Sequence, residues 1–193
     1  MQSPSILLVY GTRYGHTQKI IERMAEVIRR HGGHATTVPG NEVPEGFDPT
    51  IYDGAIVAAS VIGGRHQRYV QRFIAKQLRW LQSVPSAFFS ICGSAASPRL
   101  EEREAAYRLA DTFVTSLGWR PSVVETIGGE IAYTRYWWGL RFVMRNIAKR
   151  QGASTDTSRD IDLTNWADVD RMAAEFLKRV EEATGAAAAT TNA

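Results

Sequence analysis

The sequence predicts an α/β fold in which a five-stranded parallel sheet is covered by helices. Five short apolar runs alternate along the chain with segments whose apolar residues recur at helical spacing. This alternation is typical of parallel sheets with helices on both faces. The runs are apolar at nearly every position rather than at every second one, which indicates strands buried on both sides.

The expected strands comprise residues 5–10, 35–38, 54–59, 87–91 and 123–127. Helical spacing appears at residues 20–28, 69–81 and 99–117, and again from Asn165 to residue 180. A glycine pair at 32–33 ends the first helix, Gly118 stops the third, and Asn165 is a typical N-terminal cap for the last.

A chain of 193 residues is long enough for one domain with a full core and too short for two ordinary ones. We expect one domain over residues 1–184, with residues 128–162 inserted at the fifth strand. A disordered Ala/Thr-rich tail is expected at 185–193. With 44% hydrophobic and 22% charged residues, the composition is globular, so wholesale disorder is excluded.

One cysteine excludes an internal disulfide and a cysteine-rich metal centre, and it favours a reducing compartment. The N-terminus lacks a basic region followed by a long apolar segment, so no signal peptide is predicted. No run of 18 uncharged apolar residues appears either. We therefore expect a cytoplasmic protein without a bound metal.

Positive charge is concentrated in residues 133–150. This segment holds five Arg and Lys residues and no Asp or Glu, hence a charge of +5, whereas the whole chain carries +3. The remainder is therefore slightly acidic, at −2. Three Trp and Tyr residues at 136–138 lie in the same segment.

Ligands of doubly wound sheets bind beyond the carboxyl ends of the strands, so the loops after strands one, three and four matter most. The first, residues 11–17, runs from a strand into a helix N-terminus, where backbone N–H groups and the helix dipole favour an anion. Gly11 and Gly15 would let the backbone approach a phosphate, and Thr12 and Thr17 add hydroxyl groups. An ordinary turn between strand and helix is the alternative.

The second loop, residues 60–66, contains two glycines and could expose its backbone to a flat ligand. The third, residues 92–98, is built of small residues and could pass along the edge of such a ligand. Each pattern alone also fits a plain turn, but three permissive loops on one edge could contact one ligand together.

The first loop, Gly11-Thr-Arg-Tyr-Gly-His-Thr17, resembles the FMN-phosphate loop of flavodoxin-like proteins, whose sheet order is 2-1-3-4-5. Residues 5–180 are similar to menaquinone-dependent protoporphyrinogen IX dehydrogenases. That wider similarity rests on Tyr52-Asp53, Ala59-Ser60, Pro85-Ser-Ala-Phe-Phe-Ser90, Trp119-Arg120-Pro121, Tyr133-Thr-Arg-Tyr-Trp137, Thr155-Asp156-Thr157 and Thr164-Asn165-Trp166.

The resemblance implies an oxidoreductase of haem biosynthesis that binds FMN non-covalently. It would oxidise protoporphyrinogen IX to protoporphyrin IX and pass the electrons through FMN to a membrane quinone such as menaquinone. Phosphate contacts would come from Thr12, Arg13, Tyr14, Gly15, His16 and Thr17. The flavin ring would be flanked by Ser60, Val61, Ile62, Gly63, Gly64, Arg65 and His66 and by Cys92, Gly93 and Ser94. No catalytic side chain is predicted.

Taken as a helix, residues 133–149 place Arg141, Arg145 and Lys149 on one arc and an apolar, aromatic arc opposite. This is typical of a helix lying in a membrane interface, so we expect peripheral attachment to the inner face of the cell membrane. The residues expected to contact membrane or substrate are Tyr133, Arg135, Tyr136, Trp137, Trp138, Arg141, Arg145 and Lys149. The alternative is that the apolar arc packs on the protein's own core.

Several rival interpretations remain open from the sequence. A flavodoxin-type electron carrier is disfavoured by the pI of about 9.2, because such carriers are typically acidic. Another FMN-dependent quinone reductase, or a module that has lost its cofactor, would have the same fold. Cys92 favours a small buried residue over a flavin contact. No nucleic-acid partner is expected, and whether the protein forms a homo-oligomer is left open.

Overall fold

The computed structural model describes residues 3–131 and 159–191, and its five main strands form one parallel sheet in the order β2-β1-β3-β4-β5. The strands are β1 (Ser5–Gly11), β2 (His34–Pro39), β3 (Gly54–Ser60), β4 (Ser86–Cys92) and β5 (Val123–Gly128). The predicted fold class and strand order are confirmed. Each strand extends one residue beyond the predicted run at one or both ends.

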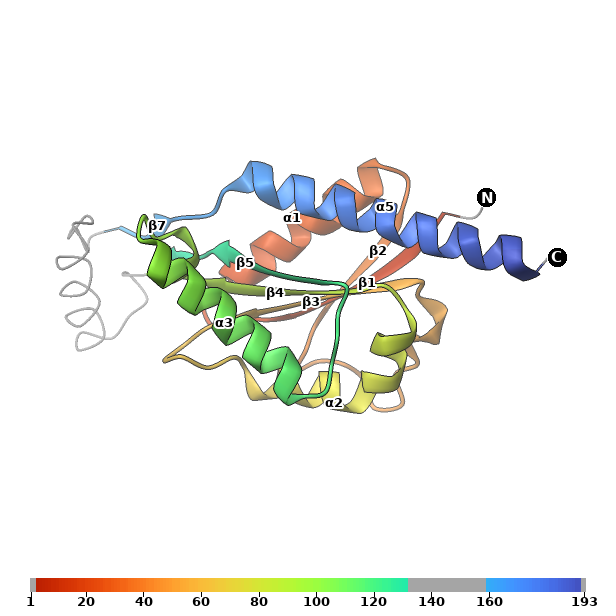
Figure 1. Ribbon diagram of the computed structural model, residues 1–193, viewed down its shortest axis with the longest axis horizontal. Helices are drawn as coiled ribbons and strands as arrows, with labels where there is room; N and C mark the ends of the chain where they lie inside the picture. Colours follow the sequence, from red (N-terminus) through yellow and green to blue (C-terminus); the bar gives the residue numbers. More distant parts are fainter. Residues whose placement is uncertain (1–2, 132–158, 192–193) are drawn as a thin grey trace.

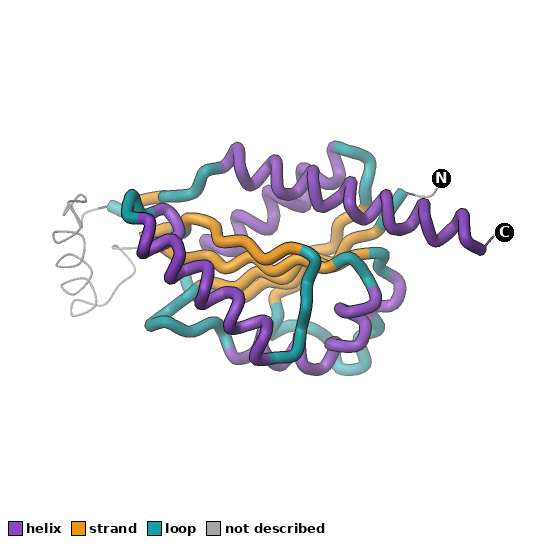
Figure 2. Tube along the Cα trace, viewed as in Figure 1, coloured by secondary structure: helices purple, strands orange, loops and turns teal. Residues whose placement is uncertain are grey.

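Helices cover both faces of the sheet and produce three layers (Figures 1 and 2). Helices α1 (His16–Arg30) and α5 (Trp166–Thr191) pack on one face, and α2 (Arg68–Ser83) and α3 (Leu100–Ser116) pack on the other. Two short 3₁₀ turns, η1 (Pro49–Ile51) and η2 (Gly93–Ala96), lie in the connections. Within the described residues, no helix is both long and apolar enough to cross a membrane.

Side chains of β1 alternate between two hydrophobic cores, one on each face of the sheet. Ile6 and Leu8 face the core under α1 and α5, whereas Leu7 and Val9 face the core under α2 and α3. All four are at most 1% exposed, which explains why the strand is apolar at each position from Ile6 to Val9. Burial on both faces leaves the ends of the strands as the places where a ligand can meet the sheet.

The last helix is longer than the sequence predicts. Helix α5 continues to Thr191 and so includes residues 185–191, for which the sequence predicts a disordered tail. Alanine has the highest intrinsic helix propensity, and this end of the chain is rich in alanine. The predicted capping role of Asn165 is confirmed, because its side-chain oxygen accepts a hydrogen bond from the Asp168 N–H at 3.4 Å.

The predicted insertion begins and ends on a small antiparallel pair. Strand β6 (Glu130–Ile131) pairs with β7 (Ile161–Asp162), with Glu130 opposite Asp162. Gly128 lies against the segment that follows β7, because a Cβ atom at this position would meet the Leu163 carbonyl oxygen and would lie 2.9 Å from Ala96 Cβ. The end of β5 and the segment that follows β7 therefore pack closely against each other.

We expect Gly128→Ala to destabilise the fold by about 1–3 kcal/mol, because the added methyl group would force backbone atoms apart. Urea denaturation measures the change in the free energy of unfolding. Gly185→Ala is the matched control, since no atom lies within 4 Å of a Cβ there. In an exposed helix this control should stabilise the protein by about 0.5–1 kcal/mol. Equal stability of Gly128→Ala and the wild type would contradict the close packing.

Candidate functional site

The loops that follow β1, β3 and β4 meet at the carboxyl edge of the sheet. The Val61 N–H of the second loop donates to the Ile91 carbonyl oxygen of β4 at 2.9 Å. The Cys92 carbonyl oxygen in turn accepts from the Gly129 N–H at 3.2 Å, which joins the third loop to the base of the insertion. Parallel pairing of Gly11 with Ala59 and of Ser60 with Ile91 sets all three loops at the same level.

The first loop closes into a tight turn at the N-terminus of α1. Gly15 caps the helix with φ 87°, a left-handed conformation that favours glycine, and its N–H donates to Thr12 Oγ1 at 2.9 Å. The first turn of α1 contains no acidic residue. The N–H groups of a first helical turn have no acceptor within the helix, so this end is positive and suited to an anion.

Thr17 provides an independent sign that a polar ligand belongs here. Its side chain is 1% exposed, and its hydroxyl has no hydrogen-bond partner in the described part of the chain. A buried hydroxyl without a partner costs free energy unless something completes its hydrogen bonding. A phosphate group bound by neighbouring amides would supply such a partner. The first loop therefore fits the mononucleotide phosphate that the sequence suggests.

Gly11 has a packing role that the sequence did not indicate. A Cβ atom at this position would lie 2.5 Å from Val70 Cγ2 and 2.7 Å from Gln67 Oε1. Glycine is required here because the end of β1 packs directly on the start of α2. Gly15 is the glycine that shapes the ligand-facing turn.

The side chain of His16 points to the base of the insertion. Its Nε2 lies 2.7 Å from Thr164 Oγ1 and 3.5 Å from Asp162 Oδ1, and its Nδ1 lies 3.8 Å from Glu130 Oε1. The histidine is buried, and the Trp166 ring packs edge-on against it at 6.0 Å between centroids. The sequence indicated no carboxylate near His16, because Glu130 and Asp162 are more than 110 residues away along the chain.

Asp162 remains ionised in this cluster. Burial raises the pKa of its carboxyl group, but hydrogen bonds from Thr164 and Trp166 outweigh burial and hold the pKa below its usual value. Lys19, in the second turn of α1, lies 3.5 Å from the Glu130 carboxylate. His16 and Lys19 thus connect the first loop electrostatically to the two strands that bracket the insertion.

The second loop has an exposed tip and an anchored base. Ile62 and Arg65 exchange backbone hydrogen bonds across Gly63 and Gly64, which both have positive φ, 57° and 74°. Two successive positive φ angles are those of a type I′ turn, and glycine adopts them without strain. Residues 62–65 are exposed at the ligand edge of the sheet and could contact a flat ligand.

His66 turns away from this edge into the protein. Its Nε2 lies 2.9 Å from Ser90 Oγ, and its ring packs on Phe113 and Phe88 at 4.4 and 5.3 Å between centroids. Burial lowers the pKa of His66 to about 4, so the imidazole is neutral at physiological pH. The side chain anchors the second loop to β4 and faces the core.

The third loop forms the short turn η2, in which Gly93 and Ser94 are exposed. Cys92 is partly buried, and burial raises the pKa of its thiol, so the group stays protonated. This agrees with the interpretation of Cys92 as a small apolar side chain. The predicted membrane or substrate contacts, from Tyr133 to Lys149, lie outside the described residues.

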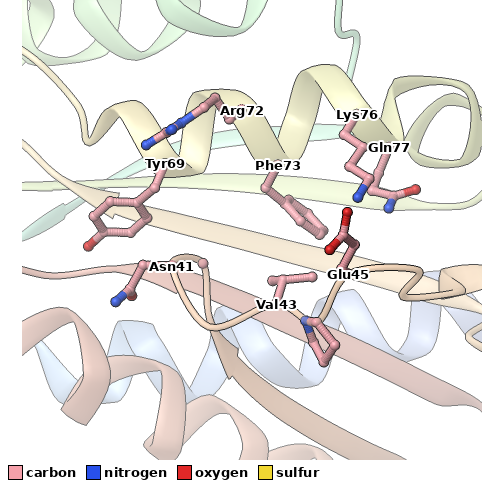
Figure 3. A pocket seen from close by; sticks show the side chains of 10 residues that line it. Asn41, Val43, Glu45, Tyr69, Arg72, Phe73, Lys76 and Gln77 are labelled. Atoms are coloured by element: carbon pink, nitrogen blue, oxygen red, sulfur yellow. The ribbon is translucent and has the colours of Figure 1, made fainter.

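An open groove of about 410 Å³ lies between α2 and the segment that follows β2 (Figure 3). Val43 and Glu45 form one wall, and Tyr69, Phe73 and Lys76 form the other. The groove contains none of the predicted cofactor contacts. One lining residue, Tyr69, also contacts the first loop, because its hydroxyl is hydrogen-bonded to the Thr12 backbone. The sequence indicated Tyr69 only as part of a helical pattern over residues 69–81.

These features agree with the comparisons of the chain with known proteins. Residues 7–158 match the model of the flavodoxin domain, and the chain belongs to that family. Oxidised flavodoxin 1 from Bacillus cereus has the same fold, with a TM-score of 0.55 and 14% identity over 90% of this chain and 97% of that one. A flavodoxin from the domain Archaea has a TM-score of 0.53 and 13% identity, over 92% and 99%.

Among curated proteins, the chain is 29% identical over 178 residues to a protoporphyrinogen IX dehydrogenase [quinone] of Escherichia coli K12. The match covers 92% of this chain and 97% of the relative. A protein of the same name from Leishmania major is 27% identical over 176 residues, which are 91% of this chain and 75% of the relative.

The depressed pKa of His66 predicts a loss of stability in mild acid. Below pH 6.5 the unfolded chain binds a proton at this residue, whereas the folded protein does not until about pH 4. The free energy of unfolding should therefore fall across this window, by at most about 3 kcal/mol from His66. Thermal unfolding of wild type and His66→Gln at pH 7 to 4 tests this, and the two stabilities should converge as the pH falls.

His34→Gln is the control for removing a histidine, because His34 is exposed at the start of β2. It should keep the wild-type dependence on pH. Parallel pH profiles for His66→Gln and wild type would show that His66 is not held neutral by the fold.

Proposed function

We propose that the protein is an FMN-dependent oxidoreductase that converts protoporphyrinogen IX to protoporphyrin IX and passes the electrons to a quinone. The observation that supports FMN most directly is the first loop, where a positive helix end and the unpartnered Thr17 hydroxyl lie together. The substrate and acceptor are suggested by the curated relatives, whose names specify both and one of which aligns over nearly its full length.

In this proposal the chain supplies binding and orientation. The phosphate is held by the first loop, Thr12, Arg13, Tyr14, Gly15, His16 and Thr17, in which Thr12 and Thr17 contribute hydroxyl groups and Arg13 contributes its backbone amide. The Thr12 hydroxyl accepts the Gly15 N–H and still has its own hydrogen to donate to a ligand. The exposed tips at 62–65 and 93–94 flank the ring system. FMN, when bound, supplies the two-electron chemistry, and no side chain is needed as a nucleophile.

Arg13 adds positive charge at the mouth of the same loop. Its guanidinium lies 5.9 Å from the centre of the Tyr14 ring, within range of a cation–π contact. Arg13 is exposed, so an anionic group on a ligand could reach it from solvent. A phosphate, or a propionate of the substrate, is such a group.

Anaerobic turnover with protoporphyrinogen IX and a menaquinone analogue is the experiment that tests this function. We expect the purified protein to show a flavin absorbance spectrum, and porphyrin fluorescence to appear only when quinone is added. A flavodoxin-type carrier would instead accept electrons from a reductase and produce no porphyrin. A colourless protein that cannot be reconstituted with FMN would contradict the proposal.

Gly15→Val should raise the Kd for FMN at least about tenfold, because valine is strained at a positive φ and would distort the turn. Fluorescence quenching of free FMN measures this affinity. Gly118→Val is the matched control, since Gly118 also has a positive φ, 68°, but follows α3 at the opposite edge of the sheet. It should lower stability and leave FMN affinity unchanged; equal loss of FMN in both variants would contradict the assignment of the loop.

We further propose that the protein attaches to the inner face of the cell membrane through its basic segment. Neutralising Arg141, Arg145 and Lys149 to Gln together should weaken binding to anionic vesicles at least about tenfold, since each cation near such a surface contributes about 1 kcal/mol. Vesicle sedimentation measures the binding. Arg72, Lys76 and Arg79, exposed on α2, provide a control triple Gln variant with the same loss of charge. If both triple variants bind vesicles alike, the basic segment is not the attachment site.

A further inference from the structure

The hydroxyl group of Tyr69 makes two hydrogen bonds to the backbone of one residue in the first loop. It accepts from the Thr12 N–H at 3.0 Å and donates to the Thr12 carbonyl oxygen at 3.1 Å. Tyr69 belongs to the first turn of α2 and is 57 residues from Thr12 along the chain. Both backbone polar groups of Thr12 are thus satisfied by a single side chain.

Thr12 is the first residue that has left the sheet. The preceding residue, Gly11, still pairs with Ala59 of β3, and on the other side the Gly40 N–H bonds to the Tyr10 carbonyl oxygen as the chain turns away from β2. The Tyr69 hydroxyl therefore takes the place that a neighbouring strand would fill. It provides an anchor at the point where the strand becomes the ligand-binding turn.

The Tyr69 side chain is itself held in place by close packing. Its ring lies against Gly40, where an added Cβ would be 3.2 Å from Tyr69 Cδ2. The next residue, Val70, is fully buried against Gly11, and Gln67 bonds to Ser60 Oγ at the end of β3. Figure 3 shows Tyr69 at one end of the groove, with its hydroxyl directed away from Phe73 and Lys76. The anchor is closely packed because the side chains of Val70 and Gln67 lie directly against the backbone of Gly11.

We propose that Tyr69 is a positioning residue that clamps Thr12 and so fixes the first loop in the shape that binds an anion. The Thr12 N–H donates to the Tyr69 hydroxyl, and Thr12 Oγ1 accepts the Gly15 N–H. The N–H groups of Thr12 and Gly15 are therefore both used within the protein. The N–H of Arg13, which has no hydrogen-bond partner in the described part of the chain, is the first amide left for a ligand. The identity of that ligand, the FMN phosphate, rests on the proposed function.

Tyr69→Phe tests the clamp, because phenylalanine keeps the ring and removes both hydrogen bonds. In the cofactor-free protein, hydrogen exchange at the Thr12 amide, measured by NMR, should become at least about tenfold faster. The Kd for FMN should rise roughly tenfold, as expected for the loss of a buried hydrogen bond. The Kd for riboflavin, which lacks the phosphate, should change less than about twofold, since the clamp acts on the phosphate loop.

Tyr107→Phe is the control, because Tyr107 is 46% exposed on α3 and distant in sequence from the loop. Tyr107→Phe should change neither hydrogen exchange at the Thr12 amide nor the Kd for either flavin. Thermal unfolding checks that both variants are folded. Unchanged exchange at Thr12 in Tyr69→Phe overturns the proposal. An equal loss of FMN and riboflavin affinity also overturns it, because Tyr69 would then act through general stability. If the wild type binds neither flavin, the proposed function fails while the Thr12 exchange rates still decide whether the clamp exists.

Discussion

Burial of strand β1 on both faces is the constraint on which the rest of this structure depends. Leu7 and Val9 must be covered by α2 and α3 while Ile6 and Leu8 are covered by α1 and α5. Parallel strands can satisfy this only through helical crossovers, which return the chain to the same edge each time. The loops after β1, β3 and β4 therefore gather at one edge of the sheet, where a ligand can contact all of them.

Two glycines allow close packing at this edge. Gly11 lets β1 meet α2 directly, and Gly128 lets β5 meet the segment after β7. Side chains then complete the anchoring, with Tyr69 holding Thr12 and His66 holding the second loop to Ser90. The loops are open to solvent at their tips and anchored at their bases, which suits the proposed binding of a flat cofactor.

The same edge is joined to the base of the basic insertion. His16 contacts Thr164 and lies beside Asp162 and Glu130, and these residues belong to the short strands that bracket the insertion or follow directly after them. A segment rich in cations and aromatic rings is thereby attached next to the proposed cofactor loop. This placement offers a physical reason why one protein could combine flavin chemistry with a membrane-borne electron acceptor.

The sequence by itself determined the fold class and the five strands, and it predicted that the first loop binds an anion. These features follow from local signals: runs of buried residues, helix caps and a glycine-containing turn before a helix. The extension of α5 through residues 185–191 also has a local cause, since alanine favours helix even in a terminal segment. Only the tertiary structure decided that Gly11 serves packing, that His66 faces the core, and that His16, Glu130 and Asp162 come together. Those roles depend on contacts between residues 24 to 148 positions apart, and neither spacing nor composition specifies such contacts.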